Sequence, residues 1–256
     1  MGTEASMNFL GHDLRLTLKR QVRTICRRHG LDFQRYPDCN STARIVALLA
    51  KRGVTLVLDV GGNTGGFART IREAGYRGRI VSFEPLSSAF AELSNYSARD
   101  RNWDVHHVAL GAHEGNVTMN VAGNSSSSSV LPMLDRHASA APTSCYVGTE
   151  TVPLNTLDNI LRKIAPDQSA PIFLKIDVQG YESAVMDGAQ ELLHSDRLIG
   201  VQLEVSFEHL YEGAPSWREL FDRMEALSLA LTSIEPMFLD PVTGQILQAD
   251  AVWLKH

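Results

Sequence analysis

The sequence predicts an α/β fold in which a mostly parallel sheet is covered by helices on both faces. Two observations predict it. Short apolar runs that are typical of buried strands alternate along the chain with segments of helical periodicity. The first run ends at a glycine cluster, as a buried parallel strand often does before its connecting helix. The length of 256 residues, with 44% hydrophobic and 21% charged residues, suits one large domain or two small ones and excludes disordered, collagenous and coiled-coil chains.

Each element is predicted from its local pattern. Apolar and β-branched runs predict strands at residues 55–60, 79–83, 105–110, 173–178 and 200–205. Helical spacing of apolar residues predicts helices at residues 41–51, 67–74, 87–99, 181–194 and 217–227. Two late runs, residues 230–234 and 251–255, are predicted to pair as an antiparallel hairpin. Residues 111–170 interrupt the alternation, and their two alternating runs, 116–121 and 146–153, predict further strands or a small insertion.

The N-terminal residues differ in charge from the rest of the chain. Residues 1–40 contain seven Lys or Arg against four Asp or Glu, whereas residues 41–256 contain 17 against 25. We therefore expect a basic helical extension, residues 1–40, followed by the main domain, residues 41–256. A helix over residues 14–29 is predicted by the spacing of its apolar residues, Leu14, Leu18, Val22 and Ile25. Its basic faces suit a solvated appendage, an anionic membrane surface or a phosphorylated substrate.

The sequence contains few signals of location. No apolar run approaches the ~18–20 residues of a membrane-spanning helix, and residues 1–30 lack a secretory signal. The cysteines Cys26, Cys39 and Cys145 have no CxxC spacing, so neither a disulfide framework nor a cysteine zinc site is expected. We expect a cytoplasmic protein, with any peripheral membrane contact made through the basic helix. The acidic main domain is not expected to bind nucleic acid, which requires a dense basic face.

A glycine-rich loop after the first predicted strand is the strongest local signal. The run LDVGGNTGG, residues 58–66, lies at the carboxyl end of the predicted sheet, where ligands bind in such folds. Glycines allow a sharp turn and the close approach of a ligand, although a plain tight turn also explains them. Glu84 ends the next strand, 23 residues after Gly61, where its carboxylate can bridge the two hydroxyls of a ribose. The pattern favours a nucleoside ligand.

Two other nucleotide motifs compete with this interpretation. A dinucleotide fingerprint read from Gly61 places Asn63 where the second glycine is required, because the pyrophosphate crowds the backbone there. No Gly-Lys-Ser/Thr follows the loop, so a Walker phosphate loop is excluded. A nucleoside without a pyrophosphate fits better, and S-adenosylmethionine is such a ligand. A dinucleotide-dependent oxidoreductase or epimerase stays open as the alternative.

Five motifs follow one another along residues 54–255, in the order VLDVGGNTG, IVSFEP, HVALGA, FLKIDVQGYE and VQLEV. In this order the sequence resembles the FkbM-like family of S-adenosylmethionine-dependent methyltransferases. The resemblance implies a class I methyltransferase fold, Rossmann-like with a seven-stranded sheet, and S-adenosyl-L-methionine as the cofactor. It implies that the cofactor is held by residues of the first three motifs, Asp59, Gly61, Gly62, Asn63, Gly65, Glu84, Pro85 and Ala109. Gln179 and Tyr181 depart from the Glu-Gly-Ala-Glu that relatives usually carry at residues 179–182.

The resemblance also points to candidates for the chemistry. Asp177 and Glu204 end the fourth and fifth predicted strands, so both are expected to face the crevice beside the cofactor's methyl group. They are candidates for a general base, or for oxygen ligands of a divalent cation such as Mg²⁺, although a carboxylate at a strand end is also a common loop cap. His209, after the fifth strand, is a third catalytic candidate, with a surface histidine as the alternative.

The expected function is methyl transfer from S-adenosylmethionine to a hydroxyl, with a sugar of a glycolipid, polysaccharide or secondary metabolite as the acceptor. A family member that binds the cofactor or a partner without turnover is the non-enzyme alternative. The serine run Ser125–Ser129 has the composition of a flexible linker. Its place after the third predicted strand puts it on the ligand side of the sheet, so we predict that it forms part of the active-site rim.

Overall fold

The computed structural model describes residues 21–22, 24–26, 28–30, 40–165, 167 and 169–255. The chain divides into two compact units, Met1–Arg44 and Ile45–His256. The helix predicted over residues 14–29 falls largely outside the described residues, and its described members 21–22, 24–26 and 28 are helical. The domain boundary at residue 40 and the role of the basic extension stay predictions.

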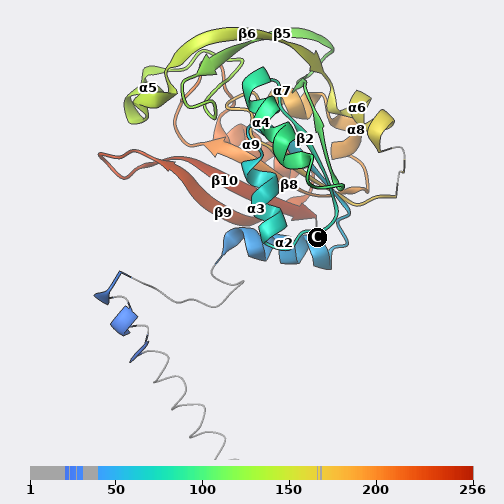
Figure 1. The fold of residues 1–256 in the computed structure, drawn as a ribbon, viewed down its shortest axis with the longest axis horizontal. Coiled ribbons are helices and arrows are strands. Elements are labelled where there is room, and N and C mark those ends of the chain that lie inside the picture. Colours follow the sequence, from blue (N-terminus) through green and yellow to red (C-terminus); the bar gives the residue numbers. More distant parts are fainter. Residues whose placement is uncertain are drawn as a thin grey trace, which may run out of the picture. The chain divides into compact units, whose positions relative to one another are not determined.

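Seven strands form one sheet in the order β3-β2-β1-β7-β8-β10-β9 (Figure 1). Neighbouring strands are parallel from β3 to β8, and β10 runs antiparallel to both β8 and β9. This arrangement confirms the predicted mostly parallel, seven-stranded sheet with a terminal hairpin. The strands are β1 (Leu56–Val60), β2 (Arg79–Phe83), β3 (Trp103–His106), β7 (Ile172–Ile176), β8 (Leu198–Ser206), β9 (Leu229–Leu239) and β10 (Ile246–Lys255).

Helices cover both faces of this sheet because successive strand side chains point to opposite sides. Val57 of β1 packs with one set of helices and its neighbour Leu58 packs with the other, and both side chains are buried. The first set is α2 (Ser41–Lys51), α3 (Gly66–Glu73) and α4 (Ser87–Ser97). The second set is α6 (Leu157–Ile164), α7 (Glu182–Asp187), α8 (Gln190–Leu193) and α9 (Trp217–Ala226).

Two predicted elements are divided in the structure. The strand predicted at residues 105–110 ends in β3 at His106, and Ala109–Leu110 form a separate strand, β4, because they pair with β6 of a second sheet. The helix predicted at residues 181–194 is split into α7 and α8 around Gly188. A Cβ on Gly188 would lie 2.0 Å from the backbone oxygen of Gly111, so the chain packs too closely there for another residue.

A three-stranded sheet in the order β4-β6-β5 arches over one end of the main sheet (Figure 1). Its antiparallel strands β5 (Gly115–Ala122) and β6 (Tyr146–Asn155) confirm the two alternating runs as strands. The connection between them contains the serine run, α5 (Asp135–Ala140) and the short 3₁₀ helix η1 (Pro142–Ser144). This insertion therefore places additional side chains above the strand ends.

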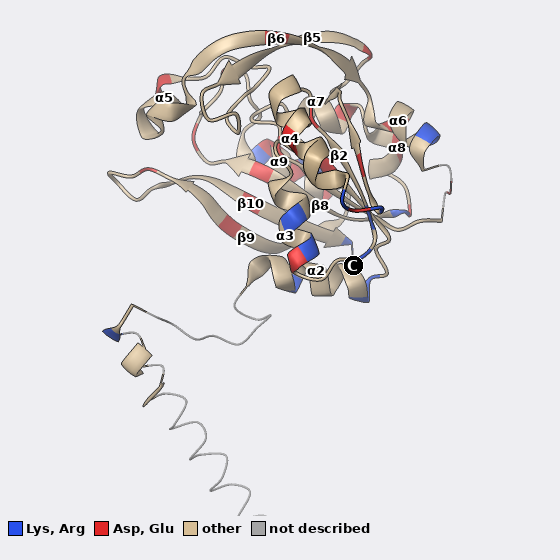
Figure 2. Cartoon of the chain, viewed as in Figure 1, with Lys and Arg blue, Asp and Glu red and all other residues tan. Residues whose placement is uncertain are grey.

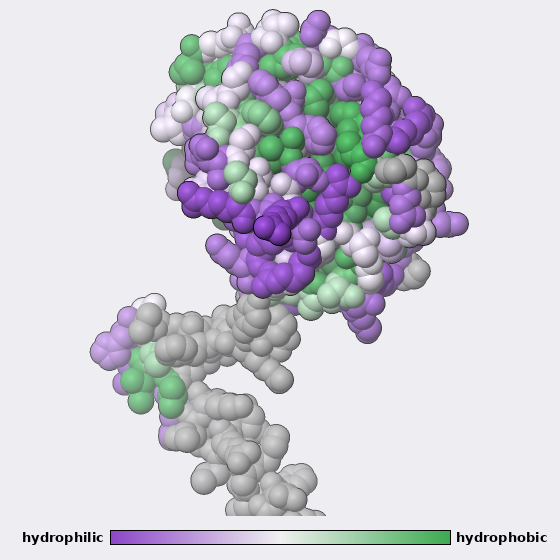
Figure 3. All heavy atoms as spheres, turned by 45° about the vertical axis from the view of Figure 1, so that its right-hand side comes forward, coloured by the Kyte–Doolittle hydropathy of each residue, from purple (hydrophilic) through white to green (hydrophobic). Residues whose placement is uncertain are grey.

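The described surface is mixed in character. Lys and Arg are dispersed over several elements (Figure 2), and the face drawn in Figure 3 carries hydrophilic and hydrophobic residues side by side. None of the helices in the described part of the chain has both the length and the apolar character that crossing a membrane demands. Single apolar residues on such a surface are ordinary for a folded protein.

Candidate active site

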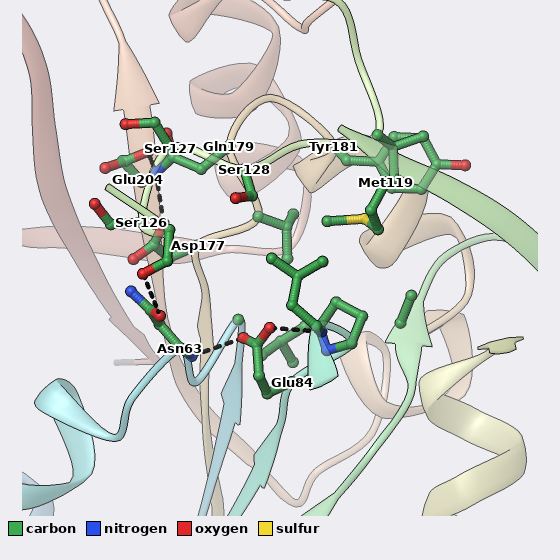
Figure 4. Close-up of a pocket in the computed structure, with 18 of the residues that line it drawn as sticks. Asn63, Glu84, Met119, Ser126, Ser127, Ser128, Asp177, Gln179, Tyr181 and Glu204 are labelled. Carbon is green, nitrogen blue, oxygen red and sulfur yellow. Dashed lines mark hydrogen bonds between the residues drawn. The ribbon is translucent and has the colours of Figure 1, made fainter. Parts of the chain in front are cut away.

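A cavity of about 350 Å³ opens where the carboxyl ends of the parallel strands meet the inserted sheet (Figure 4). Its volume is within the range of ligand pockets, about 300–1,000 Å³. Its walls come from the glycine loop, the end of β2, β4, β5, the serine run, the loop after β7 and the β9–β10 hairpin. Of the predicted site residues, the cavity is lined by Gly61, Asn63, Glu84, Pro85, Ala109, Asp177 and Glu204.

Glu84 lies at the end of β2, with its carboxylate buried at one side of the cavity (Figure 4). Its Oε2 accepts a hydrogen bond from the backbone N–H of Asn63 at 2.8 Å, and its Oε1 accepts one from Leu86 at 2.8 Å. Burial raises the pKa of Glu84 to about 7, although these two bonds act to lower it. Each carboxylate oxygen keeps a second lone pair, so both can also accept a ligand hydroxyl.

Asp59 lies behind the glycine loop and does not line the cavity, contrary to its predicted place. Its Oδ2 accepts a hydrogen bond from Ser82 Oγ at 2.8 Å, and its Oδ1 lies 3.0 Å from Lys175 Nζ. Lys175 also donates to the backbone oxygen of Gly61 at 2.8 Å and lies 3.4 Å from Asp177 Oδ2. Burial alone would lower the pKa of Lys175, but the charges of Asp59 and Asp177 raise it. Asp59 therefore holds the buried cation that supports the loop.

The loop glycines are explained by the protein's own packing. A Cβ on Gly61 would lie 1.8 Å from the backbone oxygen of Asp177, and one on Gly65 would lie 2.8 Å from the Trp103 ring. Both glycines have positive φ, 78° and 85°. Gly62 and Gly65 lie outside the cavity lining, so among the predicted glycines Gly61 alone reaches it. Close contacts within the fold therefore explain these glycines better than the approach of a ligand does.

Asp177 follows β7 and Glu204 lies near the end of β8, and the Gln179 side chain joins them (Figure 4). Nε2 of Gln179 donates to Asp177 Oδ1 at 3.0 Å and to Glu204 Oε2 at 2.6 Å. The same Glu204 oxygen accepts a hydrogen bond from Gln248 Nε2 at 2.7 Å. The Tyr211 hydroxyl donates to Gln179 Oε1 at 2.7 Å and so fixes the amide. The structure thus brings the two predicted carboxylates together and orients both.

The two carboxylates have different surroundings. Burial, and then the charges of Asp177 and Asp250, raise the pKa of Glu204 well above its ordinary value. Because Glu204 Oε2 receives two amide N–H groups, a proton on this side chain belongs on Oε1. Asp177 instead lies 3.4 Å from the ammonium nitrogen of Lys175, measured from its Oδ2. The two linked carboxyls therefore have different electrostatic surroundings.

Strained backbone is concentrated at the cavity. Four non-glycine residues in the described chain have positive φ, and three of them, Asn63, Ser125 and Gln179, line the cavity. Such conformations cost roughly 1–3 kcal/mol each and persist where surrounding contacts hold them, often at functional sites. Ser125 Oγ donates to Asn63 Oδ1 at 3.1 Å, so two of these positions support each other. This clustering is typical of a preorganised ligand site.

The serine run forms part of the cavity wall, as expected for a segment at the active-site rim. Ser125, Ser126, Ser127 and Ser128 line the cavity. Ser129 is buried, and its Oγ donates to the backbone oxygen of Gln179 at 2.7 Å. This bond connects the run directly to the residue that orients Asp177 and Glu204, which agrees with the predicted place at the active-site rim.

The structure does not bring His209 into the site. It is exposed in the segment after β8 and does not line the cavity. The cavity residues that sequence reasoning missed include His137 of the inserted segment and Met237, Phe238 and Gln248 of the terminal hairpin. No sequence signal singled them out, because they are brought there by the arch over the sheet and by the antiparallel return of β10.

The geometry does not support a magnesium site at Asp177 and Glu204. Among the described residues, no group of three or more His, Cys, Asp or Glu side chains is arranged to hold a metal ion. The amide nitrogen of Gln179 bonds to both carboxylates, at the position from which a bridging cation would bind them. The amide N–H groups therefore already serve as the partners of both carboxylates in this structure.

Comparison with a family model shows to which protein family the chain belongs. The model for the methyltransferase FkbM domain matches residues 59–230, a range that contains the glycine loop, Glu84, Asp177 and Glu204. The chain belongs to the FkbM methyltransferase family. This membership confirms the resemblance of the sequence motifs. No curated protein matches this FkbM methyltransferase.

Solved methyltransferase structures resemble the chain at low identity. An O-methyltransferase from Bacillus cereus in complex with SAH has 11% identity and a TM-score of 0.48, over 93% of this chain and 91% of that chain. The O-methyltransferase TomG from Streptomyces achromogenes, in complex with SAM, has 13% identity and a TM-score of 0.48, over 93% and 89%. The magnesium protoporphyrin IX methyltransferase ChlM from Synechocystis PCC 6803, with bound SAM, has 12% identity and a TM-score of 0.45, over 93% of this chain and 97% of that chain. With TM-scores below 0.5, these similarities carry no argument about the acceptor of this FkbM methyltransferase.

Proposed function

We propose that this FkbM methyltransferase transfers a methyl group from S-adenosylmethionine to a hydroxyl oxygen, that of a sugar in a glycolipid, polysaccharide or secondary metabolite. One observation carries the proposal. A single cavity has the Glu84 carboxylate on one side and the linked carboxyls of Asp177 and Glu204 on the other. The Glu84 carboxylate suits a ribose, and the two linked carboxyls suit an acceptor hydroxyl. Methyl donor and acceptor would therefore meet between these two sides of the cavity.

The residues around Glu84 fit S-adenosylmethionine better than a dinucleotide. The two carboxylate oxygens can accept hydrogen bonds from both ribose hydroxyls in a charge-assisted, bidentate contact. Leu86, Val108 and Leu110 line the same cavity and offer an apolar surface to an adenine ring. Among the described residues that line the cavity, none is Lys or Arg, whereas Glu84 and Asp177 are acids. This charge suits a sulfonium cation and is unfavourable for a pyrophosphate.

The chemistry on the acceptor side follows from the different surroundings of the two carboxyls. When bound, S-adenosylmethionine supplies an electrophilic methyl carbon on its sulfonium centre. Asp177 would take the acceptor's hydroxyl proton as the methyl group passes to the acceptor oxygen, and S-adenosylhomocysteine would be the leaving group. Glu204, whose pKa is raised by burial, would offer a hydrogen bond from Oε1 to a neighbouring acceptor oxygen when it carries its proton. Gln179 keeps both side chains in place, and the cavity would hold acceptor and cofactor in one orientation relative to each other.

Ligand-dependent thermal unfolding tests the proposal against its alternatives. A ligand that binds only the native state raises the unfolding midpoint by mass action. We expect S-adenosylmethionine and S-adenosylhomocysteine to raise it and NAD to leave it unchanged. Stabilisation by NAD alone would favour the dinucleotide-dependent oxidoreductase or epimerase. Cofactor binding without methylation of any hydroxyl acceptor would favour a non-catalytic family member.

Cofactor affinity is expected to fall below pH 7. Ribose hydroxyls bind the ionised form of Glu84, whose pKa is raised to about 7, so binding at lower pH must first release a proton. The affinity for S-adenosylhomocysteine should therefore weaken toward about tenfold per pH unit below this value and level off above it. Calorimetric titration over this range measures the slope. Glu84→Gln has no proton to lose there, so its affinity should be weaker and should depend less on pH. Equal pH slopes in the two proteins would contradict the role of ionised Glu84 in ribose binding.

The serine run is expected to become protected when ligands bind. Its residues line the cavity, so a bound cofactor and acceptor would contact them and limit local opening. Limited proteolysis, with cleavage sites mapped by mass spectrometry, should show slower cutting within Ser125–Ser129 in the presence of S-adenosylhomocysteine and acceptor. Cutting in the surface segment 98–102, which does not line the cavity, serves as the internal control. An unchanged rate within the serine run would remove it from the ligand site.

Partner and location remain part of the proposal. We propose a small hydroxyl-bearing molecule or glycoconjugate as substrate, no nucleic-acid partner and a cytoplasmic location. The net acidic charge of residues 41–256 supports the proposal that no nucleic acid binds, because phosphate backbones are bound by dense basic faces. Peripheral membrane contact through the basic helix at residues 14–29 stays a prediction.

A further inference from the structure

Exposed apolar side chains of the described chain are concentrated on the β9–β10 hairpin. Six of the nine large exposed hydrophobic residues lie there, namely Leu231, Ile234, Met237, Leu239, Val242 and Ile246. Val242, in the turn between the two strands, is 91% exposed, and Met237 is 57% exposed. Exposed apolar residues that cluster, unlike single ones, commonly mark a binding surface.

The turn of this hairpin lies at the cavity edge of the sheet. The antiparallel pairing of β10 with β8 places Gln248 opposite Ser206, the last residue of β8. Leu239, the last residue of β9, pairs with Ile246 at the start of β10. The turn therefore projects beyond the carboxyl end of β8 (Figure 1), and Met237 and Phe238 line the cavity itself. Met237 therefore belongs both to the exposed apolar residues of the hairpin and to the cavity wall.

The hairpin turn is held in one conformation. One oxygen of the Asp240 carboxylate accepts hydrogen bonds from the backbone N–H groups of Val242 and Thr243, both at 2.8 Å. The other oxygen forms an ion pair with Arg136 of α5 at 2.5 Å. Because α5 also borders the cavity through His137, the turn is tied to the cavity wall. Val242 is thus presented to solvent by a preorganised turn, which lowers the entropic cost of binding a ligand.

Met237 and Phe238 of the hairpin, with Ala141 of the inserted segment, give the cavity an apolar wall. Gln248, on β10 of the same hairpin, also lines the cavity and donates a hydrogen bond to Glu204. His137 in that wall stacks edge-on against Tyr211, with ring centroids 5.1 Å apart. Burial lowers the pKa of His137 to about 4, so its imidazole adds no charge at neutral pH.

The cavity volume limits how much of the acceptor fits inside. At about 350 Å³, it is at the lower end of the range for ligand pockets, about 300–1,000 Å³, and under the proposed function it also receives the cofactor. The acceptor's hydroxyl-bearing part therefore enters, and the rest of the acceptor must lie outside, along the wall that leads out of the cavity. Met237 and Phe238 place the hairpin in that wall.

We infer that the acceptor is amphipathic, with its hydroxyl-bearing part at Asp177 and Glu204 and an aliphatic chain lying on Met237, Leu239 and Val242. The inference rests on the proposed function and narrows its acceptor: it favours a lipid-linked sugar over an unmodified polysaccharide. The hydrophobic effect supplies the attraction along the hairpin, and the carboxyls select the hydroxyl.

Alkyl β-D-glucosides with methyl, hexyl and octyl chains test the inference. Their binding is measured by calorimetry on the full chain saturated with S-adenosylhomocysteine, below the concentrations at which the glucosides form micelles. We expect affinity to rise with chain length, by up to about fourfold for each methylene that is buried. The double variant Met237→Ser/Val242→Ser should lower the octyl-to-methyl affinity ratio by about tenfold or more. Val147→Ser, which removes a 73% exposed side chain of β6, should leave that ratio unchanged.

Several results would overturn the inference. Equal affinity for the three glucosides, or no saturable binding of the octyl glucoside, would show that no aliphatic chain binds to the hairpin. Binding of the octyl glucoside that begins only at concentrations where micelles form would indicate that the hairpin contacts a lipid surface. A dimer in sedimentation that the double variant separates would assign it to a second copy of this chain. The proposed function is judged separately, because loss of S-adenosylhomocysteine binding would overturn that function while a steep chain-length dependence would still show an amphipathic ligand.

Discussion

Replacing Glu84 by alanine is expected to weaken S-adenosylmethionine binding by one to two orders of magnitude, on the order of 1.5–3 kcal/mol. The variant removes a charge-assisted contact to two ribose hydroxyls. It also leaves the N–H groups of Asn63 and Leu86 without the oxygens that now accept their hydrogen bonds, which loosens the loop beside the cofactor. Calorimetric titration with S-adenosylmethionine measures the loss directly.

Two variants separate the ligand contact from a general loss of structure. Glu84→Gln keeps a carbonyl oxygen at the same place but lacks the charge, so its affinity should lie between those of the parent and Glu84→Ala. Glu92→Ala changes an exposed glutamate of α4 and should bind normally. Thermal unfolding without ligand verifies that all three variants fold. Unchanged affinity in a folded Glu84→Ala protein would take Glu84 out of the cofactor site.

Replacing Asp177 by asparagine is expected to lower turnover by ~10²–10⁴-fold while cofactor affinity stays nearly intact. Asparagine keeps an oxygen that can accept the hydrogen bond from Gln179, but it cannot take the acceptor's proton. Lys175 retains Asp59 and the backbone oxygen of Gly61 as partners, so the loop that holds the cofactor should keep its conformation. Turnover is measured as methyl transfer at saturating cofactor and acceptor.

Matched variants define what this result means. Asp187→Asn alters a half-exposed aspartate that pairs with Arg223 on the surface, and it should turn over normally. Glu204→Gln keeps a hydrogen-bond donor next to the acceptor and should lose less activity than Asp177→Asn. If Asp177→Asn and Glu204→Gln both kept near-normal turnover, neither carboxyl would act in catalysis. The mechanism would then rest mainly on proximity, and His209 would have to be brought in by a conformational change.

The sheet could be predicted because its strands are buried on both faces. In residues 79–83, Ile80, Val81 and Phe83 are apolar and suit a buried parallel strand, and β2 has those same bounds. The insertion was harder to predict, since Ala109 and Leu110 continue an apolar run but pair with β6 instead of β2. Sequence periodicity reports burial and does not report which strand is the partner.

The site could be predicted only where a residue's position in a strand decides its place. Glu84, Asp177 and Glu204 were found because the carboxyl ends of parallel strands share one edge of the sheet. Asp59 occupies a comparable position, but its carboxylate turns inward to Lys175 and Ser82. Gln248 reaches Glu204 from β10, through a pairing that no local pattern reveals. Contacts of this kind depend on the tertiary fold.

The most direct test of the central claim is to identify the atom that receives the methyl group. The protein is incubated with methyl-labelled S-adenosylmethionine and with glycolipid and polysaccharide extracts, and the labelled product is analysed by mass spectrometry and NMR. We predict a methyl ether on a sugar hydroxyl, formed by the parent protein and by Asp187→Asn and reduced at least a hundredfold (~10²) in Asp177→Asn. A methyl group on nitrogen or carbon, or equal labelling by Asp177→Asn, would contradict hydroxyl methylation at this cavity.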